Sequence, residues 1–295
     1  MCNTRKFSPA ITLLTIVNTN PDVGNNFMTT NYRKFQIINV LAIIITIAMN
    51  SLANIVRFGG VTTGEAADTF FSYFTPAGYV FSIWGLIYAL QFVFLIYQAR
   101  SNQIEAEYLG KLNYFYLIAG IFNVTWLFAF HFAVSTPILL LLTEPLILGL
   151  LISLLYIYVK LEIGVTEVPR NEKLAVHLPI SVFVGWVSVA TIANTASVLN
   201  TFLTIPLDVQ YLWTSLVLIV ALLLAIIMLV MRKDFAYALV VVWAAIGIYA
   251  KWTTLEVIPI IYWTALIVAI VTLVAIIIVP LVKRKNLVDY YLVRN

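Results

Sequence analysis

The chain has 295 residues and is unusually apolar, with 62% hydrophobic and only 10% charged residues. Soluble domains have roughly 45–50% apolar and about 25% charged residues, so this composition excludes a water-soluble globular protein. The net charge of +4 comes from basic residues in the loops between apolar runs, so it indicates no nucleic-acid partner. A single cysteine excludes an intrachain disulfide and a thiol metal site. The expected environment of this chain is the lipid bilayer.

Long apolar runs predict eight transmembrane helices. Lipid cannot satisfy backbone hydrogen bonds, so each run must form a helix of about 20 residues. The short alternating segments typical of a membrane barrel are absent. The expected spans are Phe35–Ser51, Gly78–Gln98, Asn113–Val134, Pro137–Lys160, Leu178–Leu199, Tyr211–Met231, Ala236–Ala250 and Ile258–Val282. The sequence therefore predicts an all-α, polytopic membrane protein.

The basic residues agree with this number of spans. If each run crosses the bilayer once, all of the 17 Lys and Arg residues except Arg57 and Lys251 fall on one side. The positive-inside rule assigns that side to the cytoplasm. We therefore expect an integral, multi-pass membrane protein whose N- and C-termini are both cytoplasmic.

The segments outside the spans are expected to be tails and loops. Residues 1–34 are expected to form a cytoplasmic N-terminal tail, and residues 283–295 a basic cytoplasmic tail. Met28 is a plausible start of translation, and we expect the segment before it to lack regular structure. The connection from Leu52 to Pro76 is the longest loop on the non-cytoplasmic side. A loop of this length can fold over the mouth of a helix bundle.

Three predicted helices each carry aromatic and amide residues that repeat every three or four positions and so share one helix face. These residues are Phe81, Trp84 and Tyr88 in the second helix, Asn123, Trp126 and Phe130 in the third, and Trp186, Ala190 and Asn194 in the fifth. Tyr79 lies one turn nearer the non-cytoplasmic side in the second helix. Helix direction places the three faces in the non-cytoplasmic half of the bilayer. Buried indole and amide groups need partners, so we expect these faces to turn toward each other or toward a bound molecule. The alternative is an interfacial aromatic belt with helix-packing amides.

Glu144 is the one carboxyl inside a predicted span. Charge at that depth is costly, so both a ligand or proton contact and a helix-packing role stay open. His131 is a candidate neighbour, but a lone His and a lone Glu on separate helices are weak indications of a metal, and we predict no metal and no cofactor. We also expect no enzyme, because the sequence shows no paired carboxylates, His cluster, Ser/His pair or phosphate-binding Gly loop.

The same segments resemble a known family. Residues 76–88, Pro-Ala-Gly-Tyr-Val-Phe-Ser-Ile-Trp-Gly-Leu-Ile-Tyr, are similar to the second-helix signature of the tryptophan-rich sensory protein family, also called translocator proteins or peripheral-type benzodiazepine receptors (TspO/MBR). Asn123, Trp126 and Phe130 match its third-helix pattern, and the three residues of the fifth helix match its fifth-helix pattern. The resemblance covers roughly residues 35–200. Two departures are that Tyr79 replaces a Trp and that residues 53–75 contain no Trp.

The resemblance implies a five-helix bundle over residues 35–200, followed by three additional helices over residues 201–282. It also implies a pocket, roofed by the first non-cytoplasmic loop, that binds porphyrins and other hydrophobic molecules. The residues carried over to that pocket are Phe81, Trp84, Asn123, Trp126, Trp186, Ala190 and Asn194. Lipid-facing mass, a homodimer contact and a second site all stay open as roles for the last three helices.

We therefore predict a membrane sensor or binding protein for a hydrophobic or tetrapyrrole-like ligand, held in a pocket in the non-cytoplasmic half. Stacking on Trp84, Trp126 and Trp186 and hydrogen bonds from Asn123 and Asn194 would provide recognition. The alternative is a proton-coupled transporter of a small hydrophobic molecule that uses Glu144.

Overall fold

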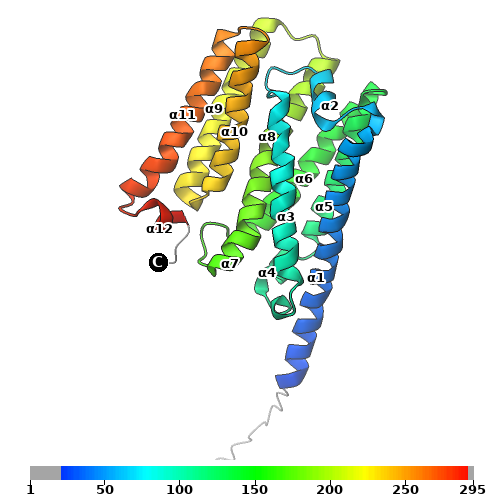
Figure 1. The fold of residues 1–295 in the computed structure, drawn as a ribbon, viewed down its shortest axis with the longest axis vertical. Coiled ribbons are helices and arrows are strands. Elements are labelled where there is room, and N and C mark those ends of the chain that lie inside the picture. Colours follow the sequence, from blue (N-terminus) through cyan, green and yellow to red (C-terminus); the bar gives the residue numbers. More distant parts are fainter. Residues whose placement is uncertain (1–20, 292–295) are drawn as a thin grey trace, which may run out of the picture.

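The computed structural model of the protein describes residues 21–291, with side chains described from Tyr32 onward. The expectations for residues 1–20 and 292–295 lie outside the described residues. Between residues 21 and 291 the chain forms helices and no strand, which confirms the all-α prediction (Figure 1).

Eight helices in the described part of the chain are long and apolar enough to cross a bilayer. They are α1 (Pro21–Leu52), α3 (Ile83–Ala99), α5 (Phe115–Ala133), α6 (Leu140–Lys160), α8 (Leu178–Phe202), α9 (Leu207–Arg232), α10 (Phe235–Thr254) and α11 (Pro259–Val282). Each corresponds to one expected span, so the prediction of eight spans is confirmed.

The ends of three helices differ from the expectations. α1 begins at Pro21, so residues 21–34, which were expected to belong to an N-terminal tail, continue the first helix. α10 has 20 residues and is longer than the span expected for it. α8 is preceded without a break by α7 (Arg170–Glu172) and the π-helix η6 (Lys173–His177). Hydropathy marks the apolar stretch of a helix, whereas the backbone stays helical beyond it.

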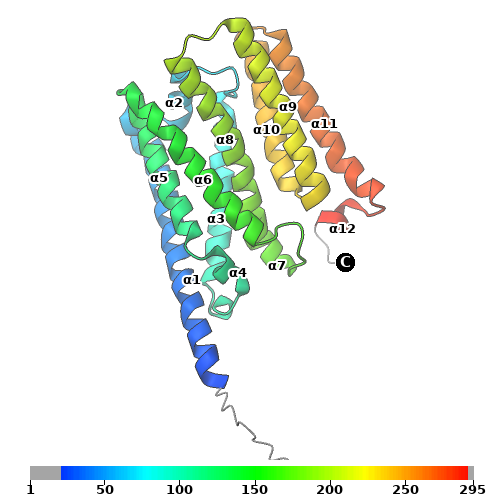
Figure 2. The ribbon, with the colours of Figure 1, turned by 180° about the vertical axis from the view of Figure 1, so that it is seen from behind.

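α8 lies at the centre of the bundle, where it packs against α6, α3 and α10 (Figures 1 and 2). None of its residues from 178 to 200 is exposed, as expected for a central helix. Its buried residues include Phe183, Val184 and Trp186. α9, α10 and α11 pack side by side, and α10 is the helix of this group that contacts α8. The α8–α10 contact therefore joins the last three helices to the first five.

The connection between α1 and α3 folds across one end of the bundle. It contains η1 (Ala53–Arg57), η2 (Phe58–Gly60) and α2 (Thr63–Thr69), and leads into the 3₁₀ turn η3 (Gly78–Ser82). α2 contacts α5 and η3. We call residues 58–77 the roof, and the end that they cover the roof end. The opposite end, here called the tail end, carries α4 (Glu107–Leu112), α7 and α12 (Leu287–Tyr291) (Figure 1).

Candidate ligand-binding site

A small cavity of about 40 Å³ lies under the roof, between α3, α5 and α8. Its walls are mostly apolar and aromatic. They are formed by Ala67, Thr75, Pro76, Phe81, Trp84, Trp126, Phe130, Trp186, Val189, Ala190, Ala193, Asn194 and Ser197. A water molecule occupies about 30 Å³ of liquid, and drug-sized ligands need roughly 300–1,000 Å³. In this conformation the cavity therefore has room for about one water molecule and not for a porphyrin.

Aromatic side chains fill the remaining space. The ring centroid of Trp84 lies 6.2 Å from that of Trp186, edge to face, and 6.5 Å from that of Trp126, with the planes 30° apart. Phe81 also meets Trp186 edge to face, at 5.9 Å. Phe130 stacks on Trp126 with centroids 5.0 Å apart. These distances lie in the range of favourable aromatic pairs, each worth about 0.5–1.5 kcal/mol beyond burial. The cluster is thus stable without a ligand.

The structure brings seven of the eleven predicted site residues into this cavity. They are Phe81, Trp84, Trp126, Phe130, Trp186, Ala190 and Asn194. They come from η3 and from the roof-end parts of α3, α5 and α8. Tyr79, Tyr88, Asn123 and Glu144 do not line it.

Tyr79 and Tyr88 lie outside the cavity for different reasons. Tyr79 lies in the 3₁₀ turn η3, where three residues rather than 3.6 complete a turn, so its side chain points away from the cavity. It is half exposed and meets Trp243 of α10 edge to face at 5.7 Å. Tyr88 stacks on the far side of Trp84 at 5.8 Å and lines a neighbouring groove. Neither tyrosine lines the cavity in this conformation.

Asn123 joins two helices rather than facing the cavity. It is fully buried, and its Oδ1 accepts a hydrogen bond of 2.7 Å from Nδ2 of Asn50 in α1. Asn50 Nδ2 also lies 2.8 Å from the carbonyl oxygen of Thr46. Amide pairs of this kind hold membrane helices together. Asn123 therefore matches the helix-packing alternative.

Glu144 does not line the cavity, but a hydrogen bond connects it to Asn194, which does. Trp126 Nε1 donates to Asn194 Oδ1 at 3.2 Å, and Asn194 Nδ2 donates to Glu144 Oε2 at 2.9 Å. The hydroxyl of Thr195 lies 2.7 Å from Glu144 Oε1. The carboxyl thus has a donor on each oxygen. Asn194, which lines the cavity, uses its amide to connect Trp126 to Glu144.

His131 is not part of this chain of hydrogen bonds. Its Nδ1 lies 2.9 Å from the carbonyl oxygen of Leu127, and its Nε2 lies 3.4 Å from Oγ1 of Thr63 in α2. Within the described chain, no hydrogen bond or ion pair links His131 to Glu144.

Two polar atoms in the cavity wall have no hydrogen-bond partner among the described residues. They are the indole Nε1 of Trp186 and the hydroxyl Oγ1 of Thr75. Both side chains are at least 98% buried. An unpaired buried polar group costs about 1–3 kcal/mol. A bound water or a ligand with a hydrogen-bond acceptor would remove this cost.

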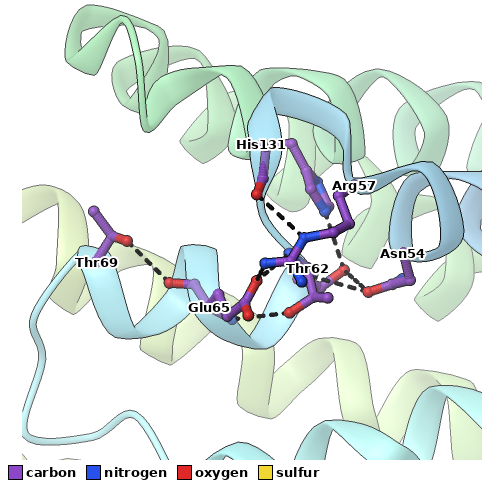
Figure 3. Close-up of polar contacts among 8 residues, drawn as sticks. Asn54, Arg57, Thr62, Glu65, Thr69 and His131 are labelled. Carbon is purple, nitrogen blue, oxygen red and sulfur yellow. Dashed lines mark hydrogen bonds and ion pairs between the residues drawn. The ribbon is translucent and has the colours of Figure 1, made fainter.

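The roof has its own polar network at the start of α2 (Figure 3). Glu65 Oε2 accepts hydrogen bonds from the backbone N–H of Thr62 at 2.8 Å and from Arg57 at 2.6 Å. Thr62 in turn caps the helix by accepting from the Glu65 backbone N–H. The hydrogen bond from Thr62, together with the charge of Arg57, lowers the pKa of the Glu65 carboxyl. α2 is therefore fixed in position by an ion pair and a capping box.

Side chains of α10 hold the far half of the roof. Lys251 Nζ lies 3.1 Å from Asp68 Oδ1, and the indole of Trp252 donates to the Tyr73 carbonyl oxygen at 2.8 Å. Tyr73 and Trp252 also pack ring against ring, with centroids 4.9 Å apart.

α10 also makes hydrogen bonds to the segment that leads from the roof into α3. The Trp243 indole donates to the Val80 carbonyl oxygen at 3.0 Å, and the Ala77 N–H donates to the Gly247 carbonyl oxygen at 3.2 Å. Trp243, Gly247 and Lys251 are spaced four residues apart and share one face of α10. The sequence analysis did not identify Trp243 and Gly247, although their four-residue spacing is visible in the sequence.

A second, larger space adjoins the cavity. A groove of about 430 Å³ lies between α1, the roof and α3. It is lined by Asn50, Ser51, Asn54, Ile55, Thr62, Thr63, Gly64, Gly78, Phe81, Trp84, Gly85 and Tyr88. Phe81 and Trp84 line both spaces, so a single layer of two aromatic side chains separates the groove from the cavity.

A family model described as TSPO-like protein matches residues 36–278. The chain belongs to the TSPO-like protein family. The resemblance in the second, third and fifth helices is therefore confirmed, and the match runs on past residue 200 into α11. No curated protein and no solved structure matches the chain.

Family membership and eight apolar helices in the described chain make this an integral, multi-pass membrane protein. The TSPO-like family is one of membrane ligand-binding or transport proteins and is generally non-enzymatic.

Proposed function

We propose that this TSPO-like protein is a non-enzymatic binding protein, or sensor, for a hydrophobic or tetrapyrrole-like ligand at the roof end. One observation carries the proposal. A cavity walled by three tryptophans also contains the unpartnered polar atoms Trp186 Nε1 and Thr75 Oγ1. A planar ligand with a carbonyl or carboxylate would stack on the indoles and accept these hydrogen bonds.

A ligand of that size requires movement of side chains. The cavity of about 40 Å³ is too small, but the groove of about 430 Å³ beside it is within the range of ligand pockets. Rotation of Phe81 and Trp84 would join the two spaces. The ligand would therefore enter between α1 and α3 and displace these two rings.

The hydrogen-bond donors differ from those expected from the sequence. Asn123 is committed to Asn50, and Asn194 to Trp126 and Glu144. Asn194 would have to give up a buried hydrogen bond to reach a ligand, at a cost of about 1–3 kcal/mol. Asn123 Nδ2 has no partner among the described residues, but Asn123 does not line the cavity. Trp186 and Thr75 have no such bond to lose, so they are the better donors.

The test is titration of the purified protein with protoporphyrin, followed by quenching of tryptophan fluorescence. Trp186→Phe keeps an aromatic ring and removes the N–H, and should weaken binding about three- to tenfold. Trp263→Phe is the matched control, because Trp263 is 54% exposed and lies on α11, away from the cavity. Equal affinities of the wild-type protein and Trp186→Phe would contradict the assigned site.

The proposed orientation places the roof end on the non-cytoplasmic side and the tail end in the cytoplasm. Its support is the distribution of basic residues, since all but Arg57 and Lys251 fall on one side of the eight spans.

A second candidate is proton-coupled transport of a small hydrophobic molecule. It is favoured by Glu144, an intramembrane carboxyl that contacts the cavity wall through Asn194. Uptake into proteoliposomes should then follow an imposed pH gradient and be lost in Glu144→Gln, while Glu107→Gln at the tail end leaves it unchanged. Uptake that is independent of the gradient would leave binding as the function.

A further inference from the structure

A second polar site lies at the tail end, where η6 and α8 meet the junction of α9 and α10. It encloses about 50 Å³. Its walls are formed by Ile163, Gly164, Lys173, Leu174, His177, Leu178, Ser181, Arg232, Lys233, Asp234, Phe235, Ala236 and Tyr291. It lies at the opposite end of the bundle from the cavity under the roof, and the proposed function does not use it.

Three basic side chains converge on this site. Arg232 lies over the Tyr158 ring at 5.7 Å and Lys233 over the Tyr290 ring at 5.8 Å. The side-chain ammonium of Lys173 makes no ion pair with another described residue. None of the three pairs with a carboxylate in the described chain. Their positive charge is therefore available to an anion.

A buried histidine adds an unused hydrogen-bonding atom. His177 is only 4% exposed and lines the site, and its Nε2 has no partner among the described residues. An unpaired ring nitrogen in such a place is costly. An oxyanion at this position would accept a hydrogen bond from it.

The one carboxyl in the wall, that of Asp234, is hydrogen-bonded within the protein. Asp234 accepts a hydrogen bond of 2.8 Å from the Tyr158 hydroxyl and one of 3.0 Å from the Tyr237 N–H, and so caps α10. Burial raises the pKa of this carboxyl. The net charge around the site is positive.

An apolar groove continues from this site along the bundle. It has a volume of about 440 Å³ and is lined by residues of α3, α8 and α10. It is lined by Ser82, Ile83, Leu86, Leu90, Leu178, Val182, Phe235, Ala236, Leu239, Val240 and Trp243. Leu178, Phe235 and Ala236 line both the basic site and the groove, so the two spaces are adjacent.

We propose that an anionic phospholipid binds here, with its phosphate between Lys173, Lys233 and His177 and an acyl chain in the groove between α3 and α10. Basic pockets between helices on the cytoplasmic side are typical sites for anionic headgroups. The lipid would fill the gap between the first five helices and the last three.

The shape of the site favours a lipid over a free phosphate ion. The enclosed polar part equals the volume of only one or two water molecules, at about 30 Å³ each. A phosphate group would therefore extend from it toward the groove. That groove is apolar and open to the bilayer, so it suits a hydrocarbon chain and not a hydrated ion.

The experiment measures lipid binding to the purified full-length protein by native mass spectrometry. Dioleoyl phosphatidylglycerol is compared with dioleoyl phosphatidylcholine, which has the same chains but no net charge. The expected result is tighter binding of phosphatidylglycerol, which Lys173→Ala combined with Lys233→Ala weakens by about fivefold for each lysine. Equal retention of both lipids would overturn the proposal.

Two controls separate this site from general attraction to a basic surface. Lys283→Ala combined with Lys285→Ala removes the same charge at the same end, outside the site, and should leave the affinity unchanged. A loss equal to that of the Lys173 and Lys233 pair would contradict the proposal. Since neither lysine pair carries a buried ion pair, both variants should fold.

The acyl chain and the phosphate are tested in separate arms. Leu239→Trp fills the groove and should weaken binding of both lipids, because Leu239 lines it and is 43% exposed. Glycerol phosphate supplies the headgroup without chains and should bind far more weakly than the lipid. If it binds as tightly, the site takes a free phosphate and the lipid proposal is wrong.

Discussion

Four indole N–H groups of this protein differ in their partners. Trp126 donates to the side chain of Asn194, and Trp243 and Trp252 donate to roof-end carbonyl oxygens. Trp186 donates to no described residue. Because a buried indole N–H normally has a partner, three of these tryptophans are committed to the fold and Trp186 is left to a ligand or water.

At the residue scale, the two partners of the ion pair between α10 and the roof differ in their exposure to solvent. The side chain of Lys251 is only 10% exposed, whereas that of Asp68 is 55% exposed. Asp68→Asn leaves a buried ammonium without its counter-charge and should cost about 1–3 kcal/mol of stability. Lys251→Met leaves an exposed carboxylate in water and should cost less than about 1 kcal/mol. Thermal unfolding in detergent measures both.

Glu256→Gln is the control for this pair, since Glu256 is an exposed carboxylate at the same end without an ion pair in the described chain. It should not change the unfolding temperature. If Lys251→Met destabilises the protein more than Asp68→Asn does, the burial argument fails.

At the scale of elements, α10 positions the roof through close backbone contact. A Cβ at Gly247 would overlap the side chain of Val80 and lie 3.1 Å from Pro76 Cβ. Gly247→Ala should therefore push η3 away from α10 and destabilise the protein by about 1–3 kcal/mol. Hydrogen exchange of residues 70–82 and thermal unfolding measure the effect.

Gly85→Ala in α3 provides the matched helix substitution. A Cβ there meets no atom within 4 Å, so the variant should be neutral or more stable by up to about 1 kcal/mol. Unchanged exchange in Gly247→Ala would show that this contact does not hold the roof.

α2 should respond to acid. Because the folded state lowers the pKa of Glu65, its ionised carboxyl stabilises α2 at neutral pH, and this stabilisation is lost as the pH falls through the folded pKa. Protection of the α2 amides, corrected for intrinsic exchange, should therefore decrease in acid. Glu65→Gln should lack this pH dependence; if it keeps the same dependence, another group is responsible.

At the scale of the whole molecule, the cavity and its support belong to different parts of the chain. All wall residues lie between Ala67 and Ser197, yet α10 contacts the roof that covers them. A chain ending at Phe202 should therefore bind protoporphyrin at least about tenfold more weakly, because the roof loses its hydrogen bonds to α10. Fluorescence titration measures this.

Co-expression of the missing piece is the control for that truncation. The chain divided between Leu203 and Thr204, in the exposed connection of α8 and α9, should recover binding when both pieces are made together. Full binding by the short piece alone would show that the roof does not depend on α10.

The proposed orientation is testable on whole cells. In a Cys2→Ser background, which has no other cysteine, Leu255→Cys at the roof end should react with a membrane-impermeant maleimide. Lys283→Cys at the tail end should react only after the membrane is permeabilised. The reverse labelling would place the tail end outside.

The sequence by itself determined the class of the protein and its eight helices. Lipid leaves the backbone no partner but itself, so a long apolar run has a single local solution and needs no tertiary information. Helical spacing likewise brought Trp84, Trp126 and Trp186 to one depth, because helix geometry is also local.

Only the tertiary structure decided which of these residues meet the cavity. The 3₁₀ turn at η3 turned Tyr79 away, and Asn50 of α1 engaged Asn123. The contact of Trp252 with Tyr73 joins residues 179 positions apart. Such contacts depend on how neighbouring helices pack, and hydropathy and spacing within one helix carry no information about that packing.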